Sequence, residues 1–431
     1  MACSRSPGWA SPSGWRWSSR CSPGSACAAS ARAAADLGYP QRVVQPAEIW
    51  DVAVIGAGPA GAMAALAAAS QHQRVVIVER FRLPRYKTCG GGLIGVSMKM
   101  LPKGITPPVR AAATSFTFSL HGKSERTRTS SVPLIRLVNR DEFDALLVGA
   151  AVTAGAVVYD DTTVTHLAAE DDIVRLTTRS RGEIRARIVV GADGSAGRTS
   201  AYVGVTLDQV DLGLEVELAT PNDQAADWAD RILIDWGAIP GAYGWVFPKG
   251  DTLSVGVIAE RGHPDQTRSY LKDFLSRLHL DHQEAVVSSG HLTRCRAENS
   301  PFYRDRVMVA GDAAGLLEPW TREGISYALR SGAIAGRKAA QASAATSAAE
   351  VAEAMTAYAE EISSTLGAEM RAGRMFMRAF TRHPRIFYMA IILLPKAWDI
   401  VVRTTSGGAN FADITRRRLA RMVLALLGSG S

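Results

Sequence analysis

Cysteines and long apolar runs are scarce in this sequence. The cysteines number five, an odd count, and they show neither C-x-x-C spacing nor a neighbouring cluster of histidines. They are Cys3, Cys21, Cys27, Cys89 and Cys295. These features exclude a disulfide framework, predict no metal site and fit a reducing cytoplasm best. The apolar run at 386–394 is far shorter than the roughly 18–20 residues that a membrane-spanning helix requires.

Acidic residues are scarce at both ends of the chain. Residues 1–48 are rich in Ser, Ala, Gly and Arg and contain two acids, so we expect a disordered N-terminal extension. Between Arg371 and Arg421, eleven Lys or Arg residues stand against two acids, a local charge of +9 in a chain whose net charge is +8. Apolar residues are interleaved with these charges, and no recognised nucleic-acid module surrounds them. We expect a solvated helical surface or a peripheral contact with the inner face of a membrane, and no nucleic-acid partner.

A complete β-α-β unit occupies residues 51–79. A short apolar strand runs directly into Gly56-Ala-Gly58-Pro-Ala-Gly61, followed by an alanine-rich helix and a second apolar strand that Glu79 closes. Gly56 permits a tight turn, Gly58 lets the backbone approach a pyrophosphate, and Gly61 allows close packing of helix and strand. The helix N-terminus offers amide donors to phosphates, and Glu79 is placed to accept hydrogen bonds from a ribose. Dinucleotide contacts are predicted for Gly56, Gly58, Ala60, Gly61, Glu79 and Arg80.

Downstream motifs favour FAD over NAD. An apolar strand ends in Gly311-Asp312-Ala-Ala-Gly315, and this segment resembles the second FAD fingerprint of the glutathione-reductase-like flavoproteins. Segment 188–194 and segment 139–144 resemble motifs of the para-hydroxybenzoate hydroxylase fold group. The resemblance implies cofactor-binding roles for Arg140, Asp193, Gly311, Asp312 and Gly315.

The resemblance also implies the fold class. We expect a mixed α/β (α+β) protein, with a Rossmann-type FAD-binding domain interleaved with an antiparallel β-sheet substrate domain, plus C-terminal helices. The expected ranges are 49–110 with 138–200 and 300–345 for the FAD-binding domain, 111–137 with 201–299 for the substrate (lipid) domain, and 346–431 for the C-terminal helical region.

Two further motifs indicate a family. Cys89-Gly90-Gly91-Gly92 resembles a loop of the geranylgeranyl reductases, and residues 240–248 fit the P-x-x-Y-x-W-x-F-P pattern of that family. Because alternate side chains of a strand point to one face, Tyr243, Trp245 and Phe247 are predicted to form an aromatic wall that binds the substrate. The alternative is that these three side chains are ordinary core residues beneath a sheet.

The resemblance assigns further roles near the flavin. Gly324 and Ile325, after the second fingerprint, belong to the family pattern and are predicted cofactor contacts, as are Cys89, Gly90 and Gly91. Cys89 and Tyr243 are the candidate catalytic residues, either of which could act as a general acid. A structural alternative for Cys89 is a small apolar residue in a glycine-rich loop.

The activity that the resemblance implies is reduction of C=C bonds in a geranylgeranyl or polyprenyl chain by FAD. The candidate substrates are prenyl diphosphates, prenylated lipids and isoprenoid quinones. NADPH and reduced ferredoxin are the candidate electron donors, and the sequence holds no second G-x-G-x-x-G unit for a separate nicotinamide-binding domain. The alternatives are a flavin monooxygenase or halogenase on the same fold, and a non-catalytic flavin-binding or membrane-associated interaction protein.

Overall fold

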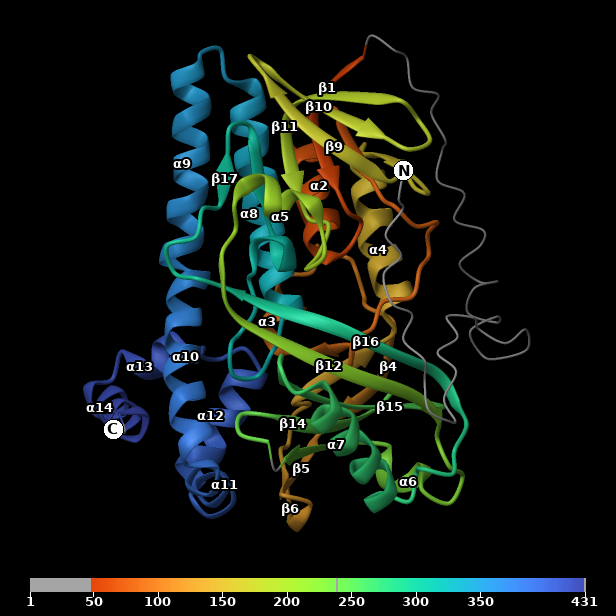
Figure 1. Cartoon of the computed structure of the whole chain (residues 1–431), viewed down its shortest axis with the longest axis vertical. Helices are drawn as coiled ribbons and strands as arrows, with labels where there is room; N and C mark the ends of the chain where they lie inside the picture. Colours follow the sequence, from red (N-terminus) through yellow and green to blue (C-terminus); the bar gives the residue numbers. More distant parts are fainter. Residues whose placement is uncertain (1–47, 238, 430–431) are drawn as a thin grey trace, which may run out of the picture.

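The computed structural model describes residues 48–237 and 239–429. The extension predicted at 1–48 lies, apart from Glu48, outside the described residues. Two large β-sheets lie one above the other in Figure 1, and a column of helices borders both of them. A third sheet has three short strands in the order β3 (Gly92–Leu93), β7 (Ile135–Val138) and β4 (Val109–Ala113).

The upper sheet in Figure 1 has eight strands and a parallel centre. Its strands are β1 (Ile49–Ile55), β2 (Val75–Val78), β8 (Val157–Tyr159), β9 (Val164–Glu170), β10 (Ile173–Thr178), β11 (Glu183–Gly191), β17 (Tyr303–Arg304) and β18 (Val307–Val309). β1 pairs in parallel with β2 and β11, while β9 and β10 form an antiparallel ribbon beside β11. Parallel strands are covered on both faces, which explains why β2 reads Val-Val-Ile-Val and is buried throughout.

Three helices pack beside the parallel strands: α2 (Pro59–Ala69), α4 (Arg140–Thr153) and α8 (Ile325–Ala344). The alanine-rich α2 and the glycines of α8 allow a very close approach. A Cβ at Gly332 would collide with the carbonyl of Ala60, and one at Gly336 with the carbonyl of Ala64. This register makes the two helices parallel, so both N-termini point to the same edge of the sheet, where helix dipoles favour an anion.

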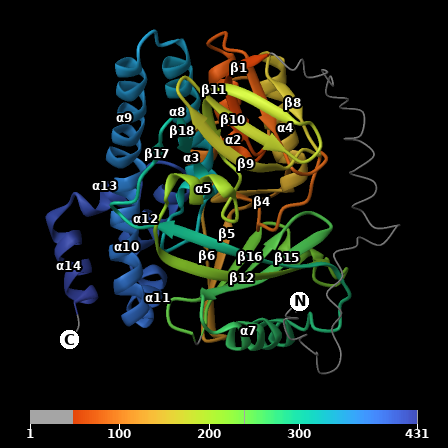
Figure 2. The same ribbon diagram turned by 45° about the horizontal axis from the view of Figure 1, so that its top comes forward.

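The second sheet has seven strands, and all neighbours are antiparallel except β13 and β5. In order, the strands are β16 (Ala285–Arg296), β12 (Leu207–Ala219), β15 (Thr252–Glu260), β14 (Tyr243–Pro248), β13 (Arg231–Trp236), β5 (Ser115–Leu120) and β6 (Lys123–Thr129). On its outer face, Leu214, Val216 and Leu218 of β12 pack with Phe274 of α7 (Pro264–Arg277). Figure 2 shows α7 beneath this sheet. The other face is therefore left for the interior of the molecule.

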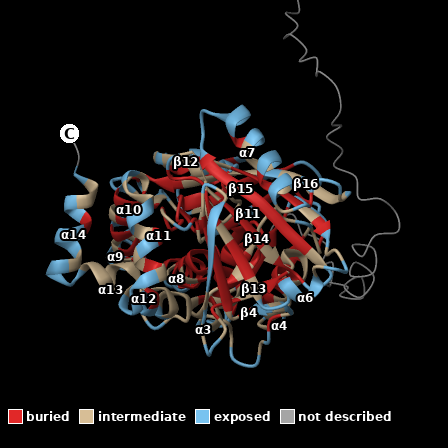
Figure 3. Cartoon of the chain, turned by 90° about the horizontal axis from the view of Figure 1, so that it is seen from below, coloured by how far each residue is buried: buried red, intermediate tan, exposed pale blue. Residues whose placement is uncertain are grey.

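C-terminal helices cover much of that interior face. They are α9 (Ala348–Ser364), α10 (Leu366–Arg382), α11 (Pro384–Leu393), α12 (Pro395–Thr405), α13 (Phe411–Thr415) and α14 (Arg418–Gly428). Phe380, Tyr388 and Trp398 from these helices form one apolar cluster with Phe116 and Trp236 of the sheet. Figure 3 shows buried strands at the centre and a largely exposed α14 at the edge. Among the described residues, none of the helices combines the length and apolar character needed to span a bilayer.

The shorter elements complete the description: α3 (Gly95–Lys99), α5 (Arg198–Val203), α6 (Ala225–Trp228) and the 3₁₀ turn η1 (Gly311–Ala314). The expected fold class is confirmed, with a Rossmann-type sheet, a second and mostly antiparallel sheet, and C-terminal helices. The sequence ranges assigned to each domain stay a prediction.

Candidate active site

One large cavity links the two sheets and the C-terminal helices. Its volume is about 1640 Å³, and its lining runs from the glycine-rich turn after β1 to α14. Most of the predicted site residues lie on its wall. They are Gly56, Gly58, Ala60, Glu79, Arg80, Cys89, Gly90, Gly91, Arg140, Asp193, Asp312, Gly324, Ile325, Tyr243, Trp245 and Phe247. Gly61, Gly311 and Gly315 do not line the cavity.

The glycines of the first turn serve different purposes. Gly56 has φ +104°, and a Cβ there would collide with the carbonyl of Ala192. A Cβ at Gly61 would collide with the carbonyl of Gly56. Gly58 differs, because a Cβ there would meet only Arg85 Nη2, at 3.6 Å. Packing of the chain requires glycine at positions 56 and 61. At Gly58, in contrast, the missing side chain leaves a space beside the N-terminus of α2 that a pyrophosphate fits.

Glu79 stands at the carboxyl end of β2 in a fixed position. Its carboxylate accepts hydrogen bonds from the backbone N–H groups of Ala57 (2.8 Å) and Phe81 (3.0 Å) and is 4% exposed. Arg85 lies between this carboxylate (3.7 Å) and that of Asp144 (3.0 Å). Arg85 belongs to the segment that precedes the Cys-Gly-Gly-Gly loop, and the sequence alone had assigned it no role. The arrangement fixes the orientation of the Glu79 carboxylate, which can accept hydrogen bonds from hydroxyl donors.

A second polar cluster lies at the start of η1. Arg140 binds Asp144 at 2.9 Å. Burial is the largest single influence on Arg140 and lowers its pKa, but Asp144 and Cys89 together outweigh burial, so that the pKa is raised. Burial also opposes the charge of Asp312, but contact with His291 (3.9 Å) and the charge of Lys87 keep the pKa of Asp312 below its usual range. Asp312 is therefore a charged acceptor in the cavity, suited to the hydroxyl groups of a ribitol chain.

Some predicted residues are committed to the chain itself. The Asp193 carboxylate accepts hydrogen bonds from the N–H groups of Arg198 (2.6 Å) and Thr199 (3.1 Å) at the start of α5. A Cβ at Gly311 would press on Ala60 and one at Gly315 on Arg296. Their role in binding a cofactor stays a prediction, and in the structure they fix the local backbone.

The Cys-Gly-Gly-Gly loop lies against the predicted aromatic wall. A Cβ at Gly90 would stand 2.6 Å from the Phe247 ring, so the glycine permits this contact. Gly91 has φ +73° and donates its N–H to Cys89 Sγ at 3.4 Å. Lys249, buried at the end of β14, donates to the Cys89 carbonyl at 3.1 Å. The loop is thereby held between the cofactor side and the wall.

Tyr243, Trp245 and Phe247 form a continuous wall as predicted. The ring centroids of Tyr243 and Trp245 are 6.2 Å apart, and those of Trp245 and Phe247 are 6.3 Å apart. The wall faces the cavity and extends over apolar neighbours on β5 and β13. These neighbours are Phe116, Phe118, Ile232, Ile234 and Trp236. The Tyr243 hydroxyl donates to the Thr321 carbonyl at 2.6 Å, which ties the wall to the segment before α8.

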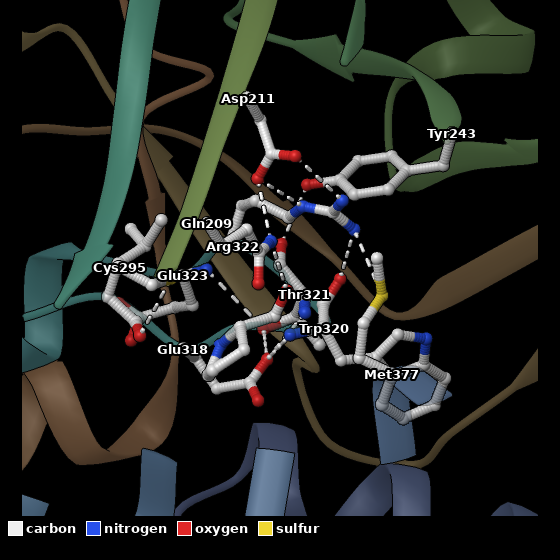
Figure 4. Close-up of polar contacts among 12 residues, drawn as sticks. Gln209, Asp211, Tyr243, Cys295, Glu318, Trp320, Thr321, Arg322, Glu323 and Met377 are labelled. Carbon is white, nitrogen blue, oxygen red and sulfur yellow. Dashed lines mark hydrogen bonds and ion pairs between the residues drawn. The ribbon is translucent and has the colours of Figure 1, made fainter. Parts of the chain in front are cut away.

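That segment, residues 318–324, is held by an internal ion pair shown in Figure 4. Arg322 has φ +57°, is 8% exposed, and binds Asp211 of β12 at 3.2 and 3.3 Å. Its guanidinium also lies 5.7 Å from the ring centroid of Tyr243. Glu318 accepts hydrogen bonds from the N–H groups of Trp320 and Thr321 (3.0 and 2.5 Å). The sequence had pointed to Gly324 and Ile325 here but not to the ion pair that positions them.

One polar residue of β12 lines the same cavity. It is Glu215, which is 2% exposed, while the neighbouring Glu217 binds Lys249 at 2.9 Å. Burial raises the pKa of Glu215 to about 7, an effect that Lys249 opposes and Glu217 reinforces. The interior face of the sheet is therefore apolar on β5, β13 and β14 and polar on β12 and β16.

Comparison with known proteins fits this geometry. Residues 50–363 match the FAD binding domain family, which is more than half of the chain. Digeranylgeranylglycerophospholipid reductase 3 of Methanosphaera stadtmanae is 30% identical over 345 residues, which cover 74% of this chain and 84% of the relative. The chain belongs to the geranylgeranyl reductase family of FAD-binding proteins. Digeranylgeranylglycerophospholipid reductase 2 of Methanopyrus kandleri is 31% identical over 353 residues, which cover 76% of this chain and 86% of that relative.

Solved structures share the fold of this chain. A geranylgeranyl bacteriochlorophyll reductase-like protein of Thermoplasma acidophilum superposes with a TM-score of 0.72 at 19% identity, covering 88% of this chain and 99% of its own. The flavin-dependent brominase Bmp2 gives a TM-score of 0.67, also at 19% identity, with 87% and 99% covered. At such identities the likeness concerns the fold alone. The family, the cavity and the glycine-rich turn together identify a FAD-dependent oxidoreductase.

Proposed function

We propose that this protein saturates C=C bonds in the isoprenoid chain of a lipid. The observation that carries the proposal is the single cavity, which joins the glycine-rich cofactor turn to the wall of Tyr243, Trp245 and Phe247. Each CH₂ group buried along such a wall contributes about 0.8 kcal/mol, so several isoprene units bind without any polar contact. Prenyl diphosphates, prenylated lipids and isoprenoid quinones all carry such a chain.

The residues of the first sheet fit FAD. Gly58 leaves space for the pyrophosphate, Glu79 offers acceptors to the adenosine ribose, and Asp312 with Arg140 offers charged partners to the ribitol. When bound and reduced, FAD supplies hydride. The chain's part is to hold the alkene next to the flavin and to exclude water, a task for the wall and the Cys89–Gly91 loop.

The distal end of the cavity suits an anionic headgroup. Lys396 and Arg417 line it there, beside exposed apolar residues of α11 and α14. We place the headgroup of the lipid at these two cations and the distal double bonds at the flavin. The same end would contact the inner face of a membrane, from which the lipid is withdrawn.

The electron donor is proposed to be NADPH or reduced ferredoxin. Either would reduce FAD without a dedicated nicotinamide domain. Stopped-flow mixing of the oxidised flavoprotein with each donor under anaerobic conditions distinguishes the two, because only the physiological donor should bleach the flavin at a rate compatible with turnover.

Anaerobic reoxidation tests the activity itself. The flavin is reduced with dithionite, and geranylgeranyl diphosphate, digeranylgeranylglycerophospholipid or menaquinone is added. We expect one of these lipids to reoxidise the flavin before any oxygen enters. A flavin that stays reduced with all three and reacts only with oxygen would favour a monooxygenase or halogenase, whose solved relatives share the fold.

A further inference from the structure

A buried carboxyl group stands beside the aromatic wall. Glu215 lies on β12, lines the cavity and is 2% exposed. Trp245 Nε1 donates to Ser254 Oγ at 3.1 Å, and Ser254 Oγ donates to Glu215 Oε1 at 3.2 Å. Within the described parts of the chain, no hydrogen bond is made by the second oxygen, Oε2. One oxygen of Glu215 is therefore fixed to the wall through a single hydroxyl, and the other is left to carry a proton.

Charged and titratable groups face Glu215 from every neighbouring element. Glu217 lies on the same strand, Lys249 on the turn after β14, and Tyr86 and Lys87 on the loop after β2. Lys87 in turn contacts His291 of β16 at 3.0 Å. Burial is the main cause that raises the pKa of Glu215, and the charge of Glu217 raises it further, whereas Lys249, Ser254 and Lys87 lower it. The resulting pKa of about 7 leaves Glu215 partly protonated at neutral pH.

Two other acids of the cavity are less suited to release a proton. The Tyr243 hydroxyl donates to Thr321, and burial raises the pKa of Tyr243 well above its usual value. Burial also raises the pKa of Glu323 to about 7, but both of its oxygens accept hydrogen bonds from Ser326 (2.7 and 2.5 Å). These two hydrogen bonds orient the Glu323 carboxyl group toward the first turn of α8, whereas one oxygen of Glu215 has no such partner.

We propose that Glu215 is the proton donor that completes saturation of the double bond, an assignment that rests on the proposed function. Bound reduced FAD would supply hydride, and with it two electrons, to one carbon of the alkene as the π bond breaks. The other carbon would accept the proton of the Glu215 carboxyl group, so that two C–H bonds form. The Glu215 carboxylate would regain a proton from water before the next turnover.

The first test replaces the acid while keeping its shape. Glu215→Gln should bind FAD and be reduced by dithionite as the wild type is, because Glu215 lies on the sheet that carries the wall. Reoxidation by the lipid that the wild type accepts should slow by about 10²–10⁴-fold, the usual contribution of a general acid. Glu215→Asp should recover part of the rate, which a merely structural role would not predict.

The pH dependence provides a second readout. A donor must be protonated, so the single-turnover rate of the wild type should be full below about pH 7 and fall as the pH rises through the pKa of Glu215. The rate of Glu215→Gln should no longer decrease as the pH rises. Glu323→Gln is the matched control, because the carboxyl group of Glu323 titrates in the same range, and the rate of that variant should still decrease with rising pH.

A third readout needs no turnover. Infrared difference spectra of flavin-free Glu323→Gln, which lacks the other carboxyl group that titrates in this range, should show a protonated carboxyl band that disappears as the pH rises through about 7 and that is absent when Glu215→Gln is added to it. Equal reoxidation rates of wild type and Glu215→Gln, or an unchanged band in the double variant, would overturn the assignment and leave the proposed function intact. A wild type that no lipid reoxidises would overturn the proposed function and this inference together.

Discussion

At the scale of single residues, the glycine-rich turn separates what the fold needs from what the ligand needs. Gly56 and Gly61 lack room for a side chain because backbone carbonyl groups of this chain stand in the way. Gly58 has room in the protein alone, since only Arg85 lies near. The demand for glycine at that position therefore comes from the cofactor.

Gly58→Val should fold and yet lose FAD. The valine side chain would occupy the space of the pyrophosphate without disturbing the packing of α2. Circular dichroism should match the wild type, while the visible absorbance of bound flavin should vanish. Gly149→Ala, at an open position on α4, is the matched control and should stay yellow. A yellow Gly58→Val protein would contradict the placement of the cofactor.

Trp245→Ala should impair turnover of the lipid without reducing the amount of bound FAD. Its indole lies between Phe247 and Tyr243 and covers Gly256, so the substitution opens the middle of the wall. We expect kcat/KM for the lipid to fall by tenfold or more, about 1.4 kcal/mol, at full FAD content. Trp228→Phe, on the outer face of the same sheet, should change stability but not kcat/KM. Unchanged kinetics of Trp245→Ala would remove the wall from the substrate site.

Residue patterns predicted the first turn, the wall and the packing role of Gly61, while the cofactor contacts of Gly61, Gly311 and Gly315 stay a prediction. Gly61, Gly311 and Gly315 belong to FAD motifs, yet in the structure they make room for this chain's own atoms rather than for the cavity. A motif cannot tell these two uses apart, because both require the same missing side chain. The atoms that surround each glycine, such as the Ala192 carbonyl beside Gly56 and Arg85 beside Gly58, distinguish the two uses.

At the scale of elements, the segment before α8 is positioned by the ion pair of Arg322 and Asp211. Both side chains are nearly inaccessible, at 2% exposure each, and Arg322 adopts the left-handed region at φ +57°. A buried ion pair costs desolvation, so its use here indicates a need for a fixed geometry more than for stability. The ion pair fixes the segment that connects Tyr243, through its hydrogen bond to Thr321, with the N-terminus of α8.

Arg322→Met should destabilise the protein by about 3–5 kcal/mol, because it leaves the Asp211 charge buried without its partner. Urea unfolding measures the change. The double variant Arg322→Met with Asp211→Asn removes both charges and should recover much of the loss. If the single variant were as stable as the wild type, the ion pair could not be what holds this segment.

The strand β12 shows why sequence reasoning missed part of the site. Its apolar residues alternate with Asp211, Gly213, Glu215 and Glu217, a pattern that normally indicates one buried and one solvated face. In the structure, the polar face borders the cavity instead, because the first sheet and the Cys89 loop cover it. Strand periodicity predicts that apolar and polar residues alternate along β12, but it does not predict which part of the molecule covers the polar face. The β-α-β unit, in contrast, was predictable since its order is local.

At the scale of the whole molecule, the C-terminal helices form both a cover and an outer surface. Their inner residues pack on the second sheet, while Leu393, Leu419 and Leu426 are 61%, 74% and 69% exposed. Arg416, Arg417, Arg418 and Arg421 stand next to them in the sequence. Exposed apolar side chains with adjacent cations are the features of a surface that contacts anionic lipid.

Leu419→Glu combined with Leu426→Glu should weaken binding to vesicles that contain anionic lipid. Each basic residue near such a surface contributes about 1 kcal/mol, so binding of the wild type should also decrease with salt. Sedimentation with phosphatidylglycerol vesicles measures both effects. Gln266→Glu with Ser276→Glu on α7 is the matched control, with the same change in charge at an exposed helix elsewhere. Equal binding by both double variants would remove α14 from the membrane contact.

The central claim is that one cavity brings an isoprenoid double bond to a reduced flavin. It is tested most directly by mass spectrometry of the lipid after anaerobic incubation with the dithionite-reduced protein. The account predicts that the lipid gains the mass of one hydride and one proton per double bond, in step with flavin reoxidation. A lipid that is recovered unchanged, or one that gains oxygen or halogen only after air is admitted, would contradict it.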